Sequence, residues 1–257
     1  MPTSSRRTRE RQLAKQARVR KRRQRILALS VGLLVALGGV GTGLFLLAKG
    51  NKAKPSASPS ASPSVGGVAC GGTVPEAASQ EKKTYKKAPA IGISRNKTYT
   101  ATMETSCGTI VMKLDPKLGL QTVNSFVFLA RKLFFDGLIF HRIARDFVIQ
   151  GGDPTGTGSG GPGYKTVNAP SKDAKYPEGI VAMAKAGNEP AGTAGSQFFI
   201  VIGKGGASLT PDYAIIGRVV EGLDVAKRIG LLPIEKNATD GRPTQAVYIV
   251  KVTVKAG

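Results

Sequence analysis

The sequence predicts a mostly-β fold, a closed antiparallel barrel with two helices, preceded by one transmembrane helix. Three observations lead to this prediction. Between residues 98 and 257, short apolar runs that alternate or are β-branched are separated by glycine-rich turns, which is typical of a barrel. Two segments of this region have helical spacing instead. An uncharged stretch at 26–48 is long enough to span a membrane.

The amino-terminal region is basic and then strongly apolar. Residues 1–25 hold eleven Lys or Arg and one Glu, and residues 26–48 hold no charged residue. A helix of this length crosses a hydrocarbon core of roughly 30 Å. The positive charge predicts a cytoplasmic tail at 1–25, a signal-anchor helix at 26–48 in the cell membrane and an extracytoplasmic domain. A cleaved signal peptide is the alternative, although no convincing small-x-small site follows the span.

Residues 49–97 are expected to form a linker and then an irregular extension. The run KPSASPSASPSVGGV, from Lys54 to Val68, has too few apolar residues to fold and predicts an extended spacer. Residues 71–97 are Lys-rich without clear periodicity, and the sequence assigns them no function. Cys70 and Cys107 would face an oxidising compartment, so either they form a disulfide or Cys107 is a free buried thiol.

The region 98–257 is expected to be the folded domain. A hairpin is predicted from 98–104 and 109–114, because both segments have strand patterns and a Ser-Cys-Gly turn separates them. A helix is predicted at 120–133, where Val123, Phe126, Val127 and Ala130 share one face. Further strands are expected in the central segment 135–153 and at 179–184, 197–202, 214–219 and 247–254, and a second helix at 222–229.

The central segment, FDGLIFHRIARDFVIQGGD, carries a cation among apolar residues. Arg142 lies between Phe140 and Ile143 in a run of strand-forming residues. Burying an unpaired guanidinium is strongly unfavourable, so Arg142 is expected to line a cleft. The alternative is that its side chain extends along a strand face toward solvent.

Composition and motifs disfavour several function classes. Of the net charge of +22, +10 lies in residues 1–25, where membrane orientation explains it, so no nucleic-acid partner is expected. Two Cys and one His cannot form the usual four-ligand zinc site. The glycine run at 154–164 fits G-x-G-x-x-G, but no helical pattern follows, so it is interpreted as a loop. His141 has no neighbour suited to a catalytic triad and is interpreted as structural. No cofactor or metal is expected.

Three strings in the domain carry a family resemblance. They are FHRIARDFVIQGGDPTGTGSGGPGY, GSQFFI and YAIIGRVVEGLDVAKRI, all within Thr98 to Val254. This region resembles the cyclophilin family of peptidyl-prolyl cis-trans isomerases, here in a bacterial, membrane-anchored form. The resemblance implies eight strands closed into a barrel with a helix at each end. It also implies an enzyme that rotates X-Pro bonds in proline-containing polypeptides without a cofactor.

The resemblance assigns roles to individual residues. Arg142 would be the catalytic donor, and Gln150 would hold its guanidinium. The proline pocket is expected to be formed by Phe147, Val148, Phe199 and Leu209, with Tyr213 beside it. The substrate backbone is expected to meet Ala184, Lys185 and Gln197.

Three positions depart from the animal members of the family. Lys185 replaces an Asn, Tyr213 replaces a His, and the pocket-edge Trp of the family falls near Ser208 in a chain without Trp. Isomerase activity is expected because the family residues matched by Arg142, Phe147, Gln150 and Phe199 are all retained. Tight cyclosporin binding, which in the family uses that Trp, is in doubt.

The residues and the resemblance lead to one main hypothesis and one alternative. The main hypothesis is a monomeric, membrane-anchored isomerase that helps secreted or envelope proteins fold, with Arg142 donating to the prolyl nitrogen. The alternative is a proline-peptide binding module or envelope scaffold with incidental turnover. The replaced positions Lys185, Ser208 and Tyr213 motivate this alternative.

Overall fold

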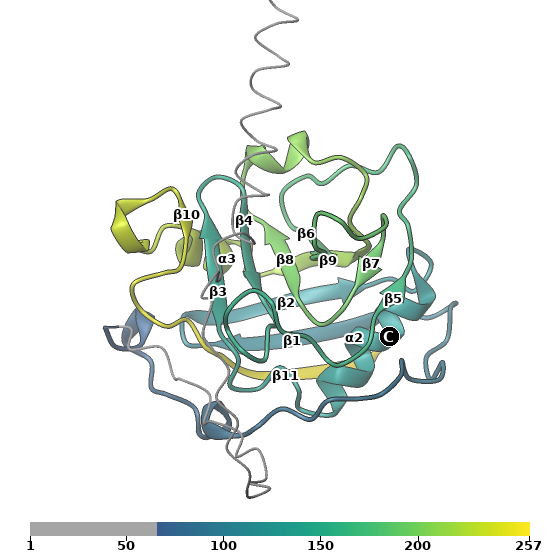
Figure 1. Cartoon of the computed structure of the whole chain (residues 1–257), viewed down its shortest axis with the longest axis horizontal. Coiled ribbons are helices and arrows are strands. Elements are labelled where there is room, and N and C mark those ends of the chain that lie inside the picture. Colours follow the sequence, from purple (N-terminus) through teal and green to yellow (C-terminus); the bar gives the residue numbers. More distant parts are fainter. Residues whose placement is uncertain (1–65) are drawn as a thin grey trace, which may run out of the picture. The chain divides into compact units, whose positions relative to one another are not determined.

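The computed structural model describes residues 66–257. The predicted basic tail, the predicted transmembrane helix at 26–48 and most of the predicted spacer therefore lie outside the described residues. Among residues 66–257, no helix has the length and apolar character needed to cross a bilayer. The described part contains eleven strands and two α-helices (Figure 1).

The strands are short and the helices few. The strands are β1 (Tyr99–Thr105), β2 (Gly108–Leu114), β3 (Phe140–Ala144), β4 (Val148–Gly151), β5 (Thr166–Val167), β6 (Ile180–Met183), β7 (Thr193–Ala194), β8 (Phe198–Val201), β9 (Ile215–Glu221), β10 (Asp240–Gly241) and β11 (Ile249–Ala256). The α-helices are α2 (Leu120–Arg131) and α3 (Leu223–Gly230). The short 3-10 helices are η1 (Ala69–Gly71), η2 (Glu76–Ser79), η3 (Lys204–Ser208) and η4 (Glu235–Asn237).

Nine strands form one curled antiparallel sheet in the order β10-β3-β4-β8-β6-β9-β2-β1-β11, and β5 pairs separately with β7. The prediction of a mostly-β fold with two helices is confirmed, but the prediction of a closed eight-stranded barrel is wrong. The sheet has two ends because β10 occupies the edge of β3 at Ile143 and Ala144. β11 approaches this edge only around an isolated bridge between Ile139 and Tyr248. Three backbone hydrogen bonds of 2.7–2.9 Å join residues 137–140 to 247–249 there, and no continuous ladder between β3 and β11 follows among the described residues.

The first hairpin and the first helix follow the sequence pattern. β1 pairs with β2 in register from Tyr99–Leu114 to Thr105–Gly108, as predicted. Helix α2 buries the predicted face, and it ends at Arg131 rather than at 133. The helix cannot continue through Leu133, because that residue adopts a left-handed conformation with φ 56°.

The inner face of the sheet carries the main hydrophobic core. Its strand residues include Ile143, Ile149, Val181, Met183, Phe198 and Ile200. From α2, Phe126 stacks on Phe135 with ring centroids 4.8 Å apart. Every second residue of β4 and β8 points to this side, as strand geometry requires, and β3 contributes Phe140 and Ile143. The other residues of β4 and β8 are therefore directed to the outer face.

A second apolar cluster covers part of that outer face. Its buried members are Ala144, Val148, Tyr176, Ala182, Phe199 and Val201, and Phe147, Ile180, Ala184, Leu209, Tyr213 and Ile215 pack against them while partly exposed. We call these twelve residues the outer cluster. Because β6 and β8 are apolar on both faces, their sequences, IVAM and FFIV, are continuous apolar runs rather than alternating ones.

The extension at 66–97 packs on the domain. Cys70 forms a disulfide with Cys107 in the turn between β1 and β2, so the structure has the bridged form of the two alternatives. Tyr85 packs edge-on against Phe128 of α2 at 5.1 Å. Asn124 of α2 accepts a hydrogen bond from the Gly92 N–H and donates one to the Ala90 carbonyl. Residues 71–97 are thus an integral part of the folded unit.

Candidate active site

A β-bulge at His141 turns Arg142 out of the core. In the pairing of β3 with β4, Phe140 lies opposite Gly151 and Arg142 lies opposite Gln150, so His141 has no partner of its own. Phe140 belongs to the inner core, and strict alternation would direct Arg142 to the same side. The extra residue resets the alternation. Arg142 therefore projects from the outer face, with 33% of its side chain exposed.

Three hydrogen bonds hold the Arg142 guanidinium. Its Nε donates to Asp240 Oδ1 at 2.7 Å, its Nη2 to Asp240 Oδ2 at 2.6 Å and its Nη1 to Gln150 Oε1 at 3.1 Å. A guanidinium carries five N–H groups, so two remain for a ligand. The two-point pairing with a carboxylate fixes the plane of the guanidinium. The remaining donors therefore have a defined direction.

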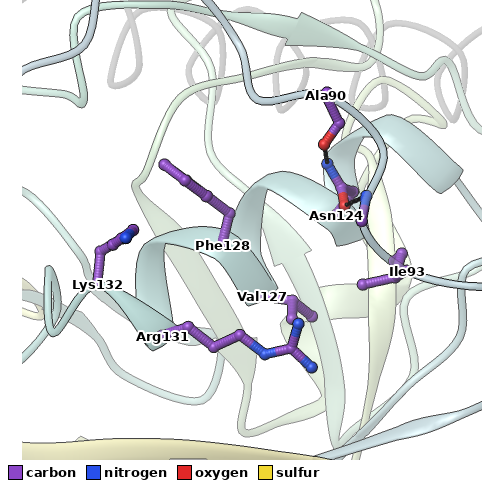
Figure 2. A pocket seen from close by; sticks show the side chains of 8 residues that line it. Ala90, Ile93, Asn124, Val127, Phe128, Arg131 and Lys132 are labelled. Atoms are coloured by element: carbon purple, nitrogen blue, oxygen red, sulfur yellow. Dashed lines mark hydrogen bonds between the residues drawn. The ribbon is translucent and has the colours of Figure 1, made fainter.

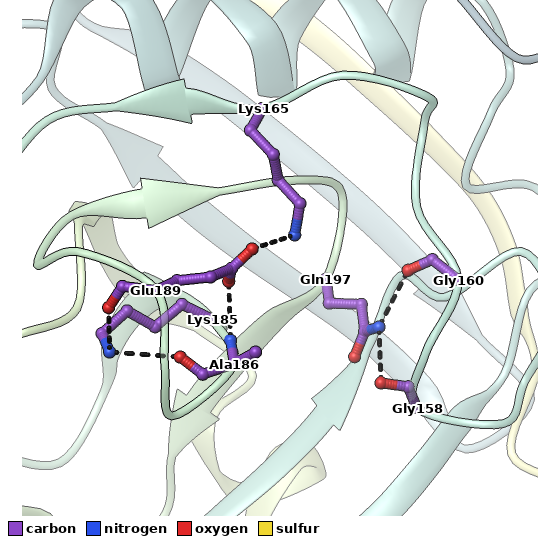
Figure 3. A network of polar contacts seen from close by, with 7 residues as sticks. All are labelled: Gly158, Gly160, Lys165, Lys185, Ala186, Glu189 and Gln197. Carbon is purple, nitrogen blue, oxygen red and sulfur yellow. Dashed lines mark hydrogen bonds and ion pairs between the residues drawn. The ribbon is translucent and has the colours of Figure 1, made fainter. Parts of the chain in front are cut away.

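Gln150 connects this cation to the glycine-rich loop. Its Nε2 donates to Gln197 Oε1 at 3.0 Å, and Gln197 Nε2 donates to the carbonyls of Gly158 and Gly160, both at 2.9 Å (Figure 3). A continuous series of polar contacts therefore runs from Asp240 to the loop. The amide nitrogen of Gln197 is occupied within the protein, and its oxygen, which already accepts from Gln150, keeps one lone pair for the predicted contact with a substrate backbone.

The predicted pocket residues gather in the outer cluster beside Arg142. Arg142, Gln150 and Phe199 lie opposite one another on β3, β4 and β8, and residues in such a row share one face of a sheet. All six apolar or aromatic residues predicted to bind substrate belong to the outer cluster: Phe147, Val148, Ala184, Phe199, Leu209 and Tyr213. The structure thus places a fixed cation next to an apolar surface that is partly exposed.

Tyr213 is held at the edge of this surface. Its ring meets the Phe199 ring edge-on at 5.4 Å. Its backbone N–H donates to the Tyr176 hydroxyl at 3.1 Å, and that hydroxyl donates to the Tyr213 carbonyl at 2.8 Å. Burial raises the pKa of Tyr213, and the Asp212 charge adds to this effect, while the positive charge of Arg142 opposes it. Tyr213 and Arg142 are therefore electrostatically coupled.

Lys185 is fixed by its own loop. Its Nζ donates to the carbonyls of Ala186 at 3.3 Å and Glu189 at 3.0 Å (Figure 3). The same Nζ lies 5.8 Å from the centroid of the Tyr213 ring. The Glu189 carboxylate accepts the Ala186 N–H at 2.7 Å and pairs with Lys165 at 2.9 Å. Burial alone would raise the pKa of Glu189, but these donors lower it below its usual value. Glu189 is thus ionised and joins the 185–189 loop to Lys165.

Asp153 anchors the start of the glycine-rich loop. Its buried carboxylate accepts hydrogen bonds from the N–H and hydroxyl of Thr155 at 2.8 and 2.9 Å and from the Gly158 N–H. Burial opposes ionisation, but these bonds lower the pKa of Asp153. Residues 154–164 contain no helix, and Gly158 has a φ of 90°. The loop interpretation is therefore correct, and no helix amino terminus is available here for a dinucleotide phosphate.

His141 sits in the bulge without a catalytic partner. It is buried, and neither ring nitrogen has a hydrogen-bond partner among the described residues. Burial lowers its pKa to about 4, although the Asp153 charge acts in the opposite direction. A triad base needs a nucleophile on one ring nitrogen and an orienting group on the other. His141 has neither in residues 66–257, where no group of three His, Cys, Asp or Glu is arranged to hold a metal ion either.

Asp240 is the residue that the sequence analysis missed. A cation in an apolar strand needs a counterion, so the sequence indicates that Arg142 has an acidic partner. It does not indicate which carboxylate of the chain is that partner. Asp240 lies in β10, which is distant from β3 in the sequence and pairs with it only in the folded structure. Ser208, in contrast, is exposed, and its hydroxyl donates to the Gly205 carbonyl at 2.7 Å rather than to a described residue around Arg142.

The fold and this site together define the class of protein, and three comparisons identify the family. A family model described as cyclophilin type peptidyl-prolyl cis-trans isomerase/CLD matches residues 100–254. The chain therefore belongs to this family of isomerases. The matched region lies within the predicted domain at 98–257.

Curated relatives come from distant organisms. A peptidyl-prolyl cis-trans isomerase of Arabidopsis thaliana is 40% identical over 157 residues, which cover 60% of this chain and 92% of the relative. Peptidyl-prolyl cis-trans isomerase A of Mycobacterium tuberculosis is 39% identical over 175 residues, covering 61% and 92%. Human peptidyl-prolyl cis-trans isomerase-like 1 is 42% identical over 153 residues, covering 58% and 88%. These relatives consist of little more than the domain they share with this chain.

Solved structures agree with the assignment. A crystal structure of a cyclophilin-type isomerase of Cryptosporidium parvum superposes with a TM-score of 0.56 at 27% identity, covering 62% of this chain and 99% of that chain. A second structure of the same protein, determined in the presence of the dipeptide Ala-Pro, gives a TM-score of 0.55 at 28% identity and the same coverage.

Proposed function

We propose that this protein accelerates rotation about X-Pro bonds, with Arg142 as the catalytic donor. The observation that supports the proposal best is the Arg142 guanidinium, fixed by Asp240 and Gln150 with two N–H groups remaining, beside the partly exposed outer cluster. This arrangement supplies one directed positive charge and one apolar surface. Bond rotation in an amide needs no nucleophile, metal or redox group.

The chemical step depends on amide resonance. Resonance creates a barrier of roughly 18–20 kcal/mol to rotation. When the bond twists, the prolyl nitrogen recovers its lone pair and becomes a hydrogen-bond acceptor. An Arg142 N–H aimed at this nitrogen binds the twisted state more strongly than either planar isomer, which lowers the barrier. The Asp240 pairing contributes because the donor is already oriented before the substrate arrives.

The outer cluster would hold the proline ring. In the proposed complex the ring packs on Phe147, Phe199 and Leu209, and Tyr213 bounds it at the edge. Holding the ring leaves the preceding residue free to rotate around the bond. The backbone of that part of the substrate would lie along Ala184, Lys185 and Gln197, with the Gln197 oxygen as acceptor.

An X-Pro peptide assay tests this proposal. Cis-to-trans exchange is measured by protease-coupled absorbance or by NMR exchange spectroscopy, for the wild type and for Arg142→Ala and Arg142→Lys. Loss of one well-placed donor is expected to reduce kcat/KM by roughly 100-fold. Arg142→Lys should recover little, because an ammonium cannot reproduce the two-point contact with Asp240. Wild-type activity in Arg142→Ala would reject the mechanism.

We also propose the membrane-anchored, extracytoplasmic setting that the sequence of residues 1–48 suggests, with secreted or envelope proteins as substrates. The support is the uncharged 26–48 stretch behind a cluster of Arg and Lys. Retention of the full chain in the membrane fraction after a carbonate wash tests anchoring. Protease accessibility of the domain in intact cells tests orientation, and release by the carbonate wash would reject the anchor.

A second candidate function is binding of proline-rich segments without a need for turnover. The fixed Lys185 loop and the occupied amide nitrogen of Gln197 favour it, because both restrict how the substrate backbone can be held. Partners lost in Leu209→Ala but kept in Arg142→Ala would support it. Equal loss in both variants would favour the enzyme.

A further inference from the structure

Away from Arg142, the extension and the end of helix α2 form a strongly basic surface. Residues 82–97 contain six Lys or Arg and no Asp or Glu, and residues 120–135 contain Arg131 and Lys132 and no acid. Seven of these cations are exposed, and we call them the basic face: Lys83, Lys86, Lys87, Arg95, Lys97, Arg131 and Lys132. None of them is in an ion pair with another described residue, in contrast to Lys165 or Lys227.

The nearest acidic residues do not neutralise this surface. Asp136 is buried. Its backbone carbonyl accepts a hydrogen bond from Nζ of Lys82, which is the remaining cation of the segment. Glu76 and Glu81 are exposed acids that precede the basic stretch in the sequence. Because like charges repel, seven unpaired cations along the extension and the end of α2 carry an electrostatic cost. A surface of this kind is suited to a partner that carries many negative charges.

A pocket opens between the cations. It has a volume of about 220 Å³ and lies between the extension and α2, lined by Ala90, Gly92, Ile93, Asn124, Val127, Phe128, Arg131 and Lys132. Figure 2 shows Val127 and Phe128 along the helix, with Arg131 and Lys132 at its carboxy-terminal end. The polar atoms of Asn124 are used by Ala90 and Gly92. The pocket therefore offers an apolar lining with cations at its rim.

Exposed apolar side chains flank the same pocket. Ile91 is 47% exposed and follows Ala90, and Leu133 is 58% exposed and follows Lys132. Their apolar surface has no use in binding a soluble polyanion. It does have a use at the interface of a bilayer, where apolar side chains enter the acyl boundary while Lys and Arg meet the headgroup phosphates.

We propose that the basic face docks the folded domain on an anionic phospholipid bilayer. Headgroup phosphates meet Arg131, Lys132, Lys86 and Lys87, and Ile91 and Leu133 enter the acyl boundary. This binding site belongs to the domain itself and does not depend on the predicted span at 26–48 or on isomerase activity. In the docked state, the extension and α2 lie against the membrane surface.

Vesicle binding tests the proposal with residues 66–257, which have their own core and lack the predicted span. Sedimentation is measured with vesicles of phosphatidylcholine alone and of phosphatidylcholine mixed with phosphatidylglycerol. We expect binding to the anionic vesicles that weakens as salt is added, because exposed charges are screened beyond about 10 Å at 0.1 M salt. Equal binding to both vesicles, or binding to soluble polyphosphate without binding to vesicles, would overturn the proposal.

Two variants with the same change in net charge locate the surface. The test variant is Lys86→Glu, Lys87→Glu, Arg131→Glu and Lys132→Glu, and the control is Lys172→Glu, Lys175→Glu, Lys204→Glu and Lys236→Glu. The test variant should lose roughly 100-fold or more in partitioning, and the control much less. Equal losses would show a dependence on total charge and reject the assigned surface.

Hydrogen exchange of the unmodified protein gives an independent readout. On anionic vesicles, amides of 83–97 and 128–133 should exchange more slowly than in solution, while those of β4 and β8 should be unchanged. This measurement needs no variant, so a folding defect cannot obscure it. Unchanged exchange in both basic segments would overturn the proposal.

Discussion

Arg142 and Asp240, 98 residues apart in the sequence, are joined by two hydrogen bonds of 2.7 and 2.6 Å. The pairing is possible because β10 lies against β3 at Ile143 and Ala144. It brings a carboxylate to the cation that the His141 bulge directs out of the core. Asp240 thus orients Arg142, and in the proposed mechanism it is a positioning residue, since it has no proposed contact with the reacting bond.

Asp240→Asn should lower kcat/KM by about tenfold, with most of the change in kcat. The substitution keeps the side-chain size but removes the charge and one of the two acceptor oxygens, so the guanidinium is less well oriented when the bond twists. The measurement is cis-trans exchange on an X-Pro peptide at several substrate concentrations.

Asp224→Asn is the matched control for this prediction. Asp224 forms an exposed pair with Arg228 on α3 at 2.9 Å, and such pairs contribute little to stability. The control should keep full activity. A change confined to KM in Asp240→Asn would indicate that Asp240 acts in substrate binding rather than in orienting Arg142.

Leu209→Ala should raise KM several-fold and leave kcat nearly unchanged. Leu209 packs on the outer cluster while partly exposed, so its loss removes apolar contact that the proline ring would make equally in the ground state and the twisted state. Such uniform binding affects KM rather than kcat. The same substitution at Leu231, which is 73% exposed, is the control. A drop in kcat with KM unchanged would contradict the assigned role.

Local features of the fold could be predicted from the sequence. The β1–β2 hairpin, the buried face of α2 and the glycine-rich loop depend on residues close together in the chain, and each was predicted from alternation, helical spacing or turn residues. The outer cluster was anticipated only through the family resemblance. Its residues come from β4, β6, β8 and the segment at 209–215, and periodicity alone does not bring such distant segments together.

The bulge and the counterion could not be predicted, for different physical reasons. A bulge is a mismatch between two strands, so it is not visible in the sequence of β3 alone; the run from Ile139 to Ile149 contains no Gly or Pro that would mark it. The choice of Asp240 among the acids of the chain is made by topology. Topology also explains why the prediction of a closed barrel was wrong. The two residues of β10 have no recognisable strand pattern, so the sequence did not indicate that β10 pairs with β3 at the end of the sheet.

Removing the disulfide should destabilise the domain by about 3–4 kcal/mol in the chain-entropy model. The bridge joins Cys70 and Cys107 across a sequence separation of 37, and opening this loop increases the entropy of the unfolded chain. Chemical denaturation of Cys70→Ala/Cys107→Ala, compared with the oxidised wild type, measures the change. Activity at low denaturant should be kept, since neither residue contacts Arg142. An unchanged unfolding midpoint would mean that the contacts of 71–97 hold the extension without the bridge.

Acidification from about pH 7 to pH 5 should cost roughly 2 kcal/mol of folding free energy through His141. Burial lowers the pKa of His141 from 6.5 to about 4, so the unfolded chain binds a proton before the folded one does. The stabilising contribution is complete above pH 6.5 and is lost as the pH falls toward 4.

The His141→Gln variant isolates this effect. Its free energy of unfolding should be less sensitive to pH over the same range, because the group that titrates is absent. Burial raises the pKa of Asp136, which acts in the opposite direction, but Asp136 is present in both proteins, so its effect cancels in the comparison. Equal pH dependence in the two proteins would mean that the folded chain accepts the proton at His141. That would require the bulge to open or a water to reach the ring nitrogens.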